Sequence, residues 1–250
     1  MNSVTNSVTN NAGYGRLTGV LIAAWFIFAV SASALHLFKT DPDVPPLAMG
    51  LAVLIPLVVF LLWFRTSAGF REFALSLNPG VLTFVQSWRI AGLAFLALYT
   101  VGLLPGVFAL PAGWGDIAIG ATAPLAALKL ANFRRRRSFG LWQVLGIFDL
   151  VTAVTVGTTA RWISPNEVGT GLMTVLPLSL IPTFAVPLLM MLHIICIAQA
   201  RQWRAGVDAQ VGEQLRAVAS CRLWSEATQH GYSMQRYSMQ HGLSARISAS

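Results

Sequence analysis

Long apolar stretches without a charged residue limit how this chain can fold more than any other feature. Leu17–Phe38 and Leu47–Phe64 are two of them, and each is bounded by polar or basic residues. Hydrophobic residues make up 55% of the 250 residues and charged residues only 10%, whereas soluble domains carry about 25% charged residues. About 20 apolar residues in a helix cross the roughly 30 Å hydrocarbon core of a bilayer. The sequence therefore predicts a helical integral membrane protein with several crossings.

Six segments have the length and composition of membrane spans, and together they predict an all-α bundle of six transmembrane helices. The fourth segment is the weakest, since it is short, rich in Ala and Gly, and interrupted by Pro124. The predicted spans are Leu17–Phe38, Leu47–Phe64, Ile90–Leu110, Ile117–Phe133, Phe139–Ala160 and Leu172–Gln199.

The distribution of basic residues predicts the orientation, because Lys and Arg gather in cytoplasmic loops. With six spans, all but two of the 17 Lys and Arg residues fall on one side, the exceptions being Lys39 and Arg161. This pattern places both termini in the cytoplasm. Without the fourth span, the basic run Arg134–Arg137 would fall on the outer side.

The chain divides into a polar N-terminal segment (1–16), a transmembrane domain (17–200) and a cytoplasmic tail (201–250). Val207, Val211, Leu215 and Val218 recur at helical spacing and predict a short amphipathic helix at the start of the tail. The rest of the tail is polar and predicts disorder. Residues 16–34 also resemble a cleavable signal peptide ending in small residues, and this alternative to an uncleaved first span stays open.

The formal charge of +8 raises the question of an anionic partner. The basic residues flank apolar spans and form no stripe with exposed aromatics, which argues against nucleic acid. Arg134–Arg137 are instead expected to meet anionic lipid headgroups. Formation of a homo-oligomer stays open.

Asp149 is the most informative residue, because a carboxylate at the centre of a span costs about 2.5–3.5 kcal/mol and is a functional candidate by default. Small residues share its helix face, whereas Phe148, Leu150 and Val151 should point to lipid. Asp149 could carry a proton, bind a cation or anchor a polar network. The alternative is a packing residue that is hydrogen-bonded to Tyr99, Thr100 or Thr152.

Two further charged residues have competing interpretations. Arg89 could bind an anion at the cytoplasmic mouth of the third span, but a snorkelling anchor is the plainer interpretation. Asp116 ends the expected outer turn 111–116, where it would cap the fourth helix.

The segment Arg65–Trp88 contains scattered apolar residues and is expected to lie along the cytoplasmic interface.

Other chemistry has little support in the sequence. Met190, His193 and Cys196 form a helical stripe of soft donors, which supplies too few fixed ligands for a metal site. No phosphate-binding loop or hydrolase motif is present, so we expect neither a cofactor nor a metal. Pro177, Pro182 and Pro187 are expected to kink the last span.

The stretch from Gln86-Ser-Trp-Arg through Leu104-Pro-Gly to Ala123-Pro124, together with Gly146-Ile-Phe-Asp149-Leu, resembles uncharacterised bacterial polytopic membrane proteins without an assigned activity. The resemblance implies a bacterial cytoplasmic membrane and no particular activity.

Three functions are compatible with these patterns. The leading hypothesis is a small-solute or proton-coupled permease-like protein that uses Asp149. The second is a non-transporting structural or regulatory membrane protein. An intramembrane lipid-modifying enzyme is the third, although no second acid, base or metal ligand is evident beside Asp149.

Overall fold

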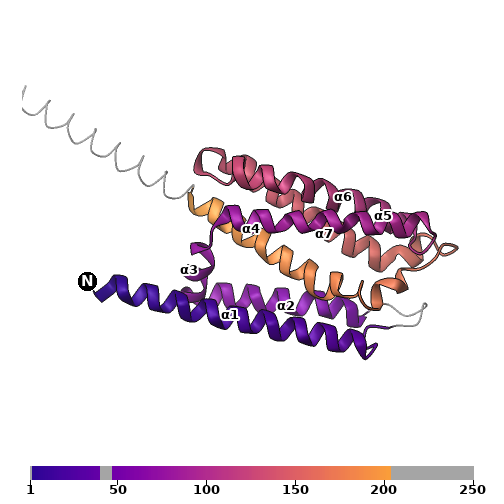
Figure 1. Cartoon of the computed structure of the whole chain (residues 1–250), viewed down its shortest axis with the longest axis horizontal. Helices are drawn as coiled ribbons and strands as arrows, with labels where there is room; N and C mark the ends of the chain where they lie inside the picture. The colour runs from indigo at the N-terminus through magenta and orange to yellow at the C-terminus, as the bar shows by residue number, and fades with distance from the viewer. Residues whose placement is uncertain (1, 40–46, 204–250) are drawn as a thin grey trace, which may run out of the picture. The chain divides into compact units, whose positions relative to one another are not determined.

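The described residues, 2–39 and 47–203, form helices and turns without a strand (Figure 1). This arrangement comes from a computed structural model, which confirms the all-helical prediction. Within these described ranges, five helices are long and apolar enough to cross a membrane: Gly13–Ala34, Leu47–Thr66, Pro79–Thr100, Phe133–Ile163 and Ile181–Trp203.

The second span matches its predicted segment closely, whereas the first differs from its prediction at both ends. α1 (Asn2–Ala34) begins far before the expected Leu17 and ends earlier than the expected Phe38. α2 (Leu47–Thr66) is followed by the short α3 (Ala68–Ser76), which Ser67 caps by accepting a hydrogen bond from the Phe70 amide. The ring of Phe70 stacks on Trp63 with centroids 3.8 Å apart, and this contact holds α3 against the end of α2.

The third span begins earlier than predicted, and the interface assignment of Arg65–Trp88 is therefore wrong for its second half. Asn78 accepts hydrogen bonds from the amides of Gly80 and Val81, while Pro79 occupies the first turn of the helix. Asn followed by Pro at this position starts a helix and does not break one. The span consists of α4 (Pro79–Val85), the 3₁₀ segment η1 (Gln86–Gly92) and α5 (Leu93–Thr100).

Residues 111–116 are not an outer turn, which corrects the prediction for Asp116. They lie inside α6 (Gly106–Leu125), which continues as the π-helical η2 (Ala126–Leu130). The turn comes earlier, at Val101–Pro105, where Gly102 has a φ of 72°. Asp116 is thus no helix cap; the carboxylate at the start of α6 belongs to Glu167, which accepts a hydrogen bond from the Gly106 amide. An anionic group is favourable at this helix end.

The remaining elements also differ in their bounds from the predicted ones. A 3₁₀ turn, η3 (Phe133–Arg135), precedes α7 (Arg136–Ile163), which is longer than predicted. The last span starts at Ile181 and not at Leu172. The 3₁₀ helix η4 (Thr170–Thr174) and a turn lie before it, and its first residues form the π-helical η5 (Ile181–Ala185). Pro177 and Pro182 lack the amide hydrogen that a regular helix needs here.

α6 packs against the third span and α7 and carries the core that positions the site. It packs along η1, α5 and α7, while α2 packs on α3 and on η5 (Figure 1). One apolar cluster joins α5, α6, α7 and η4, and another joins α2, α7 and the last span. Leu150 belongs to the second cluster and is buried, so its expected lipid exposure is wrong; Phe148 and Val151 are exposed as predicted.

Polar side chains occupy the interior, and large apolar side chains cover much of the outer surface. The buried polar or charged residues are Ser33, Thr83, Gln86, Arg89, Gln143, Ser179, Thr183, His193 and Gln199. This distribution suits a bundle surrounded by hydrocarbon, in which polar groups find partners only inside. The predicted amphipathic helix and disordered tail fall on residues 204–250, outside the described residues.

Candidate functional site

Arg89 lies near the middle of the third span and is paired with two carboxylates. Its Nε donates a hydrogen bond to Asp116 Oδ1 at 2.7 Å, and its Nη2 donates to Asp149 Oδ2. The side chain of Arg89 is only 1% exposed, whereas those of Asp116 and Asp149 are 15% and 14% exposed. The three groups come from η1, α6 and α7, so the ion pairs connect three helices. We call this cluster the Arg89 triad.

The remaining guanidinium nitrogen of Arg89 also has partners. Nη1 donates to the Gly146 carbonyl at 3.1 Å and lies 3.4 Å from His193 Nε2. An arginine fork can serve several acceptors at once because its donors are fixed in one plane. The prediction that Arg89 is a snorkelling anchor at the helix mouth is therefore wrong.

The hydrogen bonds of Gln143 determine the tautomer of His193. The Gln143 side-chain amide donates from Nε2 to Thr83 Oγ1 at 3.0 Å, so its Oε1 is the acceptor that faces His193 Nδ1. Nδ1 must then carry the ring proton, and Nε2 presents a lone pair to Arg89. His193 is thus a neutral acceptor that supports the guanidinium.

A chain of polar groups continues from the Arg89 triad in one direction. It runs from His193 through Gln143 to Thr83, whose hydroxyl donates to the Pro79 carbonyl at 2.8 Å. The Cys196 thiol lies 3.9 Å from the same hydroxyl. Since Pro79 begins the third span, the chain connects the middle of the bundle with one of its ends.

Glycines bring the helices close enough for these contacts. A Cβ atom on Gly115 would overlap the Asp149 carboxylate, and one on Gly146 would overlap the His193 ring. Gly120 lies against the backbone of Arg89 and Ile90. Small residues permit this close backbone approach between membrane helices. α6 overlaps the fourth predicted span, whose many Ala and Gly residues made it the weakest of the six. The same small residues let the helices come close enough for the triad to form.

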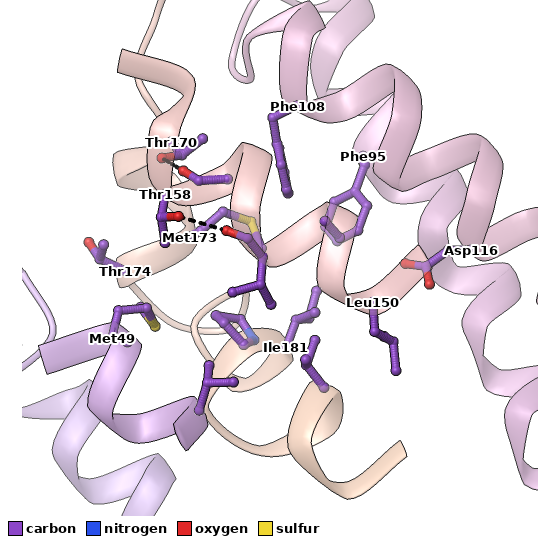
Figure 2. Close-up of a pocket in the computed structure, with 17 residues that line it drawn as sticks. Met49, Phe95, Phe108, Asp116, Leu150, Thr158, Thr170, Met173, Thr174 and Ile181 are labelled. Atoms are coloured by element: carbon purple, nitrogen blue, oxygen red, sulfur yellow. Dashed lines mark hydrogen bonds between the residues drawn. The ribbon is translucent and has the colours of Figure 1, made fainter. Parts of the chain in front are cut away.

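A cavity of about 90 Å³ reaches Asp116 (Figure 2). Figure 2 shows Thr158, Thr170 and Thr174 at the end opposite Asp116. Among the described residues that line it, Asp116 is the one ionisable group; its walls include Met49, Val53, Phe95, Phe108, Leu150 and Met173. The volume suffices for several water molecules. Asp116 thus has the cavity on one side and Arg89 on the other.

The structure brings together Arg89, Asp116 and Asp149 but not the other candidates. Thr100 and Thr152 donate to carbonyls of their own helices, and the exposed Tyr99 places its ring against Gly106. The sequence reasoning gave no role to Gln143 or Thr83, although polar residues inside apolar segments were the available signal. No group of three or more His, Cys, Asp or Glu residues that could hold a metal occurs among the described residues.

The region that contains this site also matches a known family. A family model described as a domain of unknown function, DUF8737, matches residues 45–201. The chain belongs to the DUF8737 family. The DUF8737 region contains the whole Arg89 triad, the His193–Gln143–Thr83 chain and the cavity, while α1 precedes it. Comparisons with the curated proteins and with the solved structures give no match.

Proposed function

We propose that this protein is a proton-coupled carrier of a small solute and that the Arg89 triad is its proton-binding site. One observation carries the proposal: two carboxylates share a single arginine in the middle of the bundle, and one of them also lines a cavity. Intramembrane ionisable residues that face a cavity are typical of proton and solute pathways. Asp149, the residue selected from the sequence, acts here together with Asp116.

The charge of the triad favours uptake of a proton or another cation. With both carboxylates ionised, the triad carries one net negative charge, because Arg89 is the one cation among the described residues that pairs with them. His193 supplies no positive charge, since its Nε2 faces the guanidinium. An unbalanced charge is unfavourable in surroundings of low dielectric constant. One bound proton makes the triad neutral, and the carboxylates can share it as a coupled pair.

Two routes lead to the triad. The cavity approaches Asp116 from the η4 end, and the His193–Gln143–Thr83 chain approaches Arg89 from the end where the third span begins. A carrier with alternating access needs a central site that can be reached from each side in turn. The kinked start of the last span at Pro182 borders the cavity and is suited to such a movement.

The carrier has six crossings in this proposal, with α6 as the sixth. α6 contains 20 residues, which is about 30 Å of helix, and it packs between η1, α5 and α7. Asp116 lowers its hydropathy, but this carboxylate is paired inside the bundle. Both termini then lie in the cytoplasm, in a bacterial cytoplasmic membrane, and Arg134–Arg137 meet anionic headgroups.

The alternative is a non-transporting membrane protein in which the triad only fastens three helices together. The complete pairing of Arg89 favours this alternative, because each of its side-chain nitrogens has an acceptor. A triad with a purely structural role would keep one protonation state. The triad of a proton-coupled carrier must instead change its protonation state during each transport cycle.

Infrared difference spectroscopy of the reconstituted protein separates the two functions. We expect the C=O band of a protonated carboxyl group to disappear as the pH is raised from about 5 to 9. Asp149→Asn and Asp116→Asn should each remove or shift this band, whereas Glu167→Gln, at the start of α6, should leave it unchanged. If no carboxyl band changes with pH in the parent protein, the triad is a permanent fastening and the carrier proposal fails.

A further inference from the structure

We infer that the cavity beside Asp116 binds a small organic monocation with an apolar body, in exchange for the proton of the Arg89 triad. This inference rests on the proposed carrier function and names the class of solute. It starts from the contrast between the walls of the cavity and its floor, since apolar side chains surround a single carboxylate.

The floor of the cavity attracts positive charge. Asp116 faces the cavity while Arg89 of η1 holds its Oδ1, and Asp149 of α7 pairs with the other end of the same guanidinium. His193 of the last span is uncharged, and the described cavity residues of α2 are Met49, Gly50 and Val53, which carry no charge. The charged groups around Asp116 therefore add up to one negative charge when the proton is absent, and a monocation balances it.

The walls of the cavity select an organic cation over a hard metal ion. Na⁺, Ca²⁺ and Mg²⁺ need several oxygen ligands around the ion. Among the described residues, Asp116 is the one carboxylate that lines the cavity, and the Thr158, Thr170 and Thr174 hydroxyls lie at the opposite end, too far away to share an ion with it (Figure 2).

Two aromatic rings add a second preference for an organic cation. Phe95 of α5 and Phe108 of α6 lie with their ring centroids 5.4 Å apart and both line the cavity. An alkylammonium head is attracted to aromatic faces, and its apolar substituents gain contact with Met49, Met173 and Leu150. A neutral solute would gain the apolar contacts but could not take the place of the proton in balancing the charge of the triad.

The exchange balances charge without any further reactant. When the monocation enters, the proton bound by Asp116 and Asp149 leaves to the water at the cavity mouth, and the net charge of the site stays at zero. When the cation leaves, a proton returns. Cation and proton therefore exclude one another, which is the coupling that an exchanger needs.

Proton release on ligand addition tests the inference directly. Tetramethylammonium, a small cation with a permanent charge, is added to the weakly buffered, detergent-solubilised full-length protein in the presence of a pH-sensitive dye. We expect a release that approaches about one proton per protein at pH values where the infrared carboxyl band is present. Neopentane, in which carbon replaces the charged nitrogen, should release none, and neither should K⁺ at the same concentration.

Two variants locate the event in the cavity. Asp116→Asn should abolish the release. Gly50→Leu should also abolish it while leaving the infrared band unchanged, because the Gly50 position has open space around it and its new side chain would fill the cavity without reaching the triad. Gly19→Leu is the matched control, since Gly19 in α1 also has nothing within 4 Å and does not line the cavity.

The outcomes distinguish this inference from the carrier proposal. A parent protein whose carboxyl band titrates but which releases no proton to tetramethylammonium overturns the organic-cation site and leaves the carrier proposal standing. Equal release by K⁺ or by neopentane also overturns it, in favour of an inorganic cation or a purely apolar ligand. Release that persists unchanged in Gly50→Leu places the exchange outside the cavity and overturns the inference as well.

Discussion

Gly115 of α6 lies directly against the carboxylate of Asp149 in α7, and a Cβ atom at position 115 would overlap Asp149 Oδ1. The carboxylate itself is fixed on its other side by the Arg89 guanidinium. Because Gly115 has no side chain, α6 and α7 can lie this close together beside the Arg89 triad.

Gly115→Ala should disturb the triad more than its size suggests. The added methyl group must either push Asp149 away from Arg89 or separate α6 from α7, and overpacking of this kind costs about 1–3 kcal/mol. Unfolding in mixed micelles measures the loss of stability, and Gly140→Ala is the control, because a Cβ at Gly140 of α7 meets nothing within 4 Å. Equal stability of the two variants would show that Asp149 does not occupy the space beside Gly115.

Arg89→Met should be strongly destabilising, because it leaves two buried carboxylates without their cation. Breaking a buried ion pair by removing one partner costs about 3–5 kcal/mol. Adding Asp116→Asn and Asp149→Asn to the Arg89→Met protein removes the orphaned charges and should restore much of the stability. The comparison is made by unfolding of the single and triple variants. No recovery in the triple variant would mean that Arg89 acts through its shape and not through its charge.

His193 should carry its ring proton on Nδ1. Nitrogen-15 NMR of histidine-labelled protein distinguishes the two neutral tautomers, and we expect an unprotonated Nε2. Gln143→Met removes the acceptor that fixes this tautomer and should change the His193 signals; the loss of these buried hydrogen bonds costs about 1–3 kcal/mol. Thr155→Val, which removes an exposed hydrogen bond within α7 and leaves Gln143 in place, should leave the signals unchanged. A parent spectrum with the proton on Nε2 would contradict the assignment.

The corrected position of the turn before α6 gives a topology prediction. A cysteine at Gly102, in the turn, should react with an impermeant maleimide from the outside, as should one at Glu167. A cysteine at Gly113, inside α6, should be protected in intact cells. Cysteines at Arg135 and Ser250 should react only after the cells are opened. External labelling at Ser250 would contradict six crossings.

The sequence predicted the helical segments well because hydropathy depends on local composition. The wrong predictions concern segments that contain Pro and Gly. Asn78-Pro79 and Pro111–Asp116 have the composition of turns, yet the first starts a helix and the second lies inside one. The difference arises because glycines in a membrane bundle also serve close helix packing, and a single sequence does not separate the two uses.

The candidate site could be predicted only in part, because its contacts join residues that are far apart in the sequence. The burial of Asp149 followed from its position in a span, but its partner Arg89 lies 60 residues away. Arg89 follows Trp88 at the edge of an apolar run, and this local pattern is the same for an anchor at the interface. Arg89 lies in the middle of its span only because the span starts at Pro79, well before the expected Ile90.

The Arg89 triad also has a consequence for how the chain is made. Arg89 leaves the ribosome 27 residues before Asp116 and 60 residues before Asp149. A lone arginine at the centre of a nascent span costs about 2.5–3.5 kcal/mol during insertion. If α6 crosses the membrane as proposed, the hairpin of the third span and α6 is the smallest piece of the growing chain in which Arg89 has an ionic partner. We therefore expect stable insertion of the third span to require the synthesis of α6.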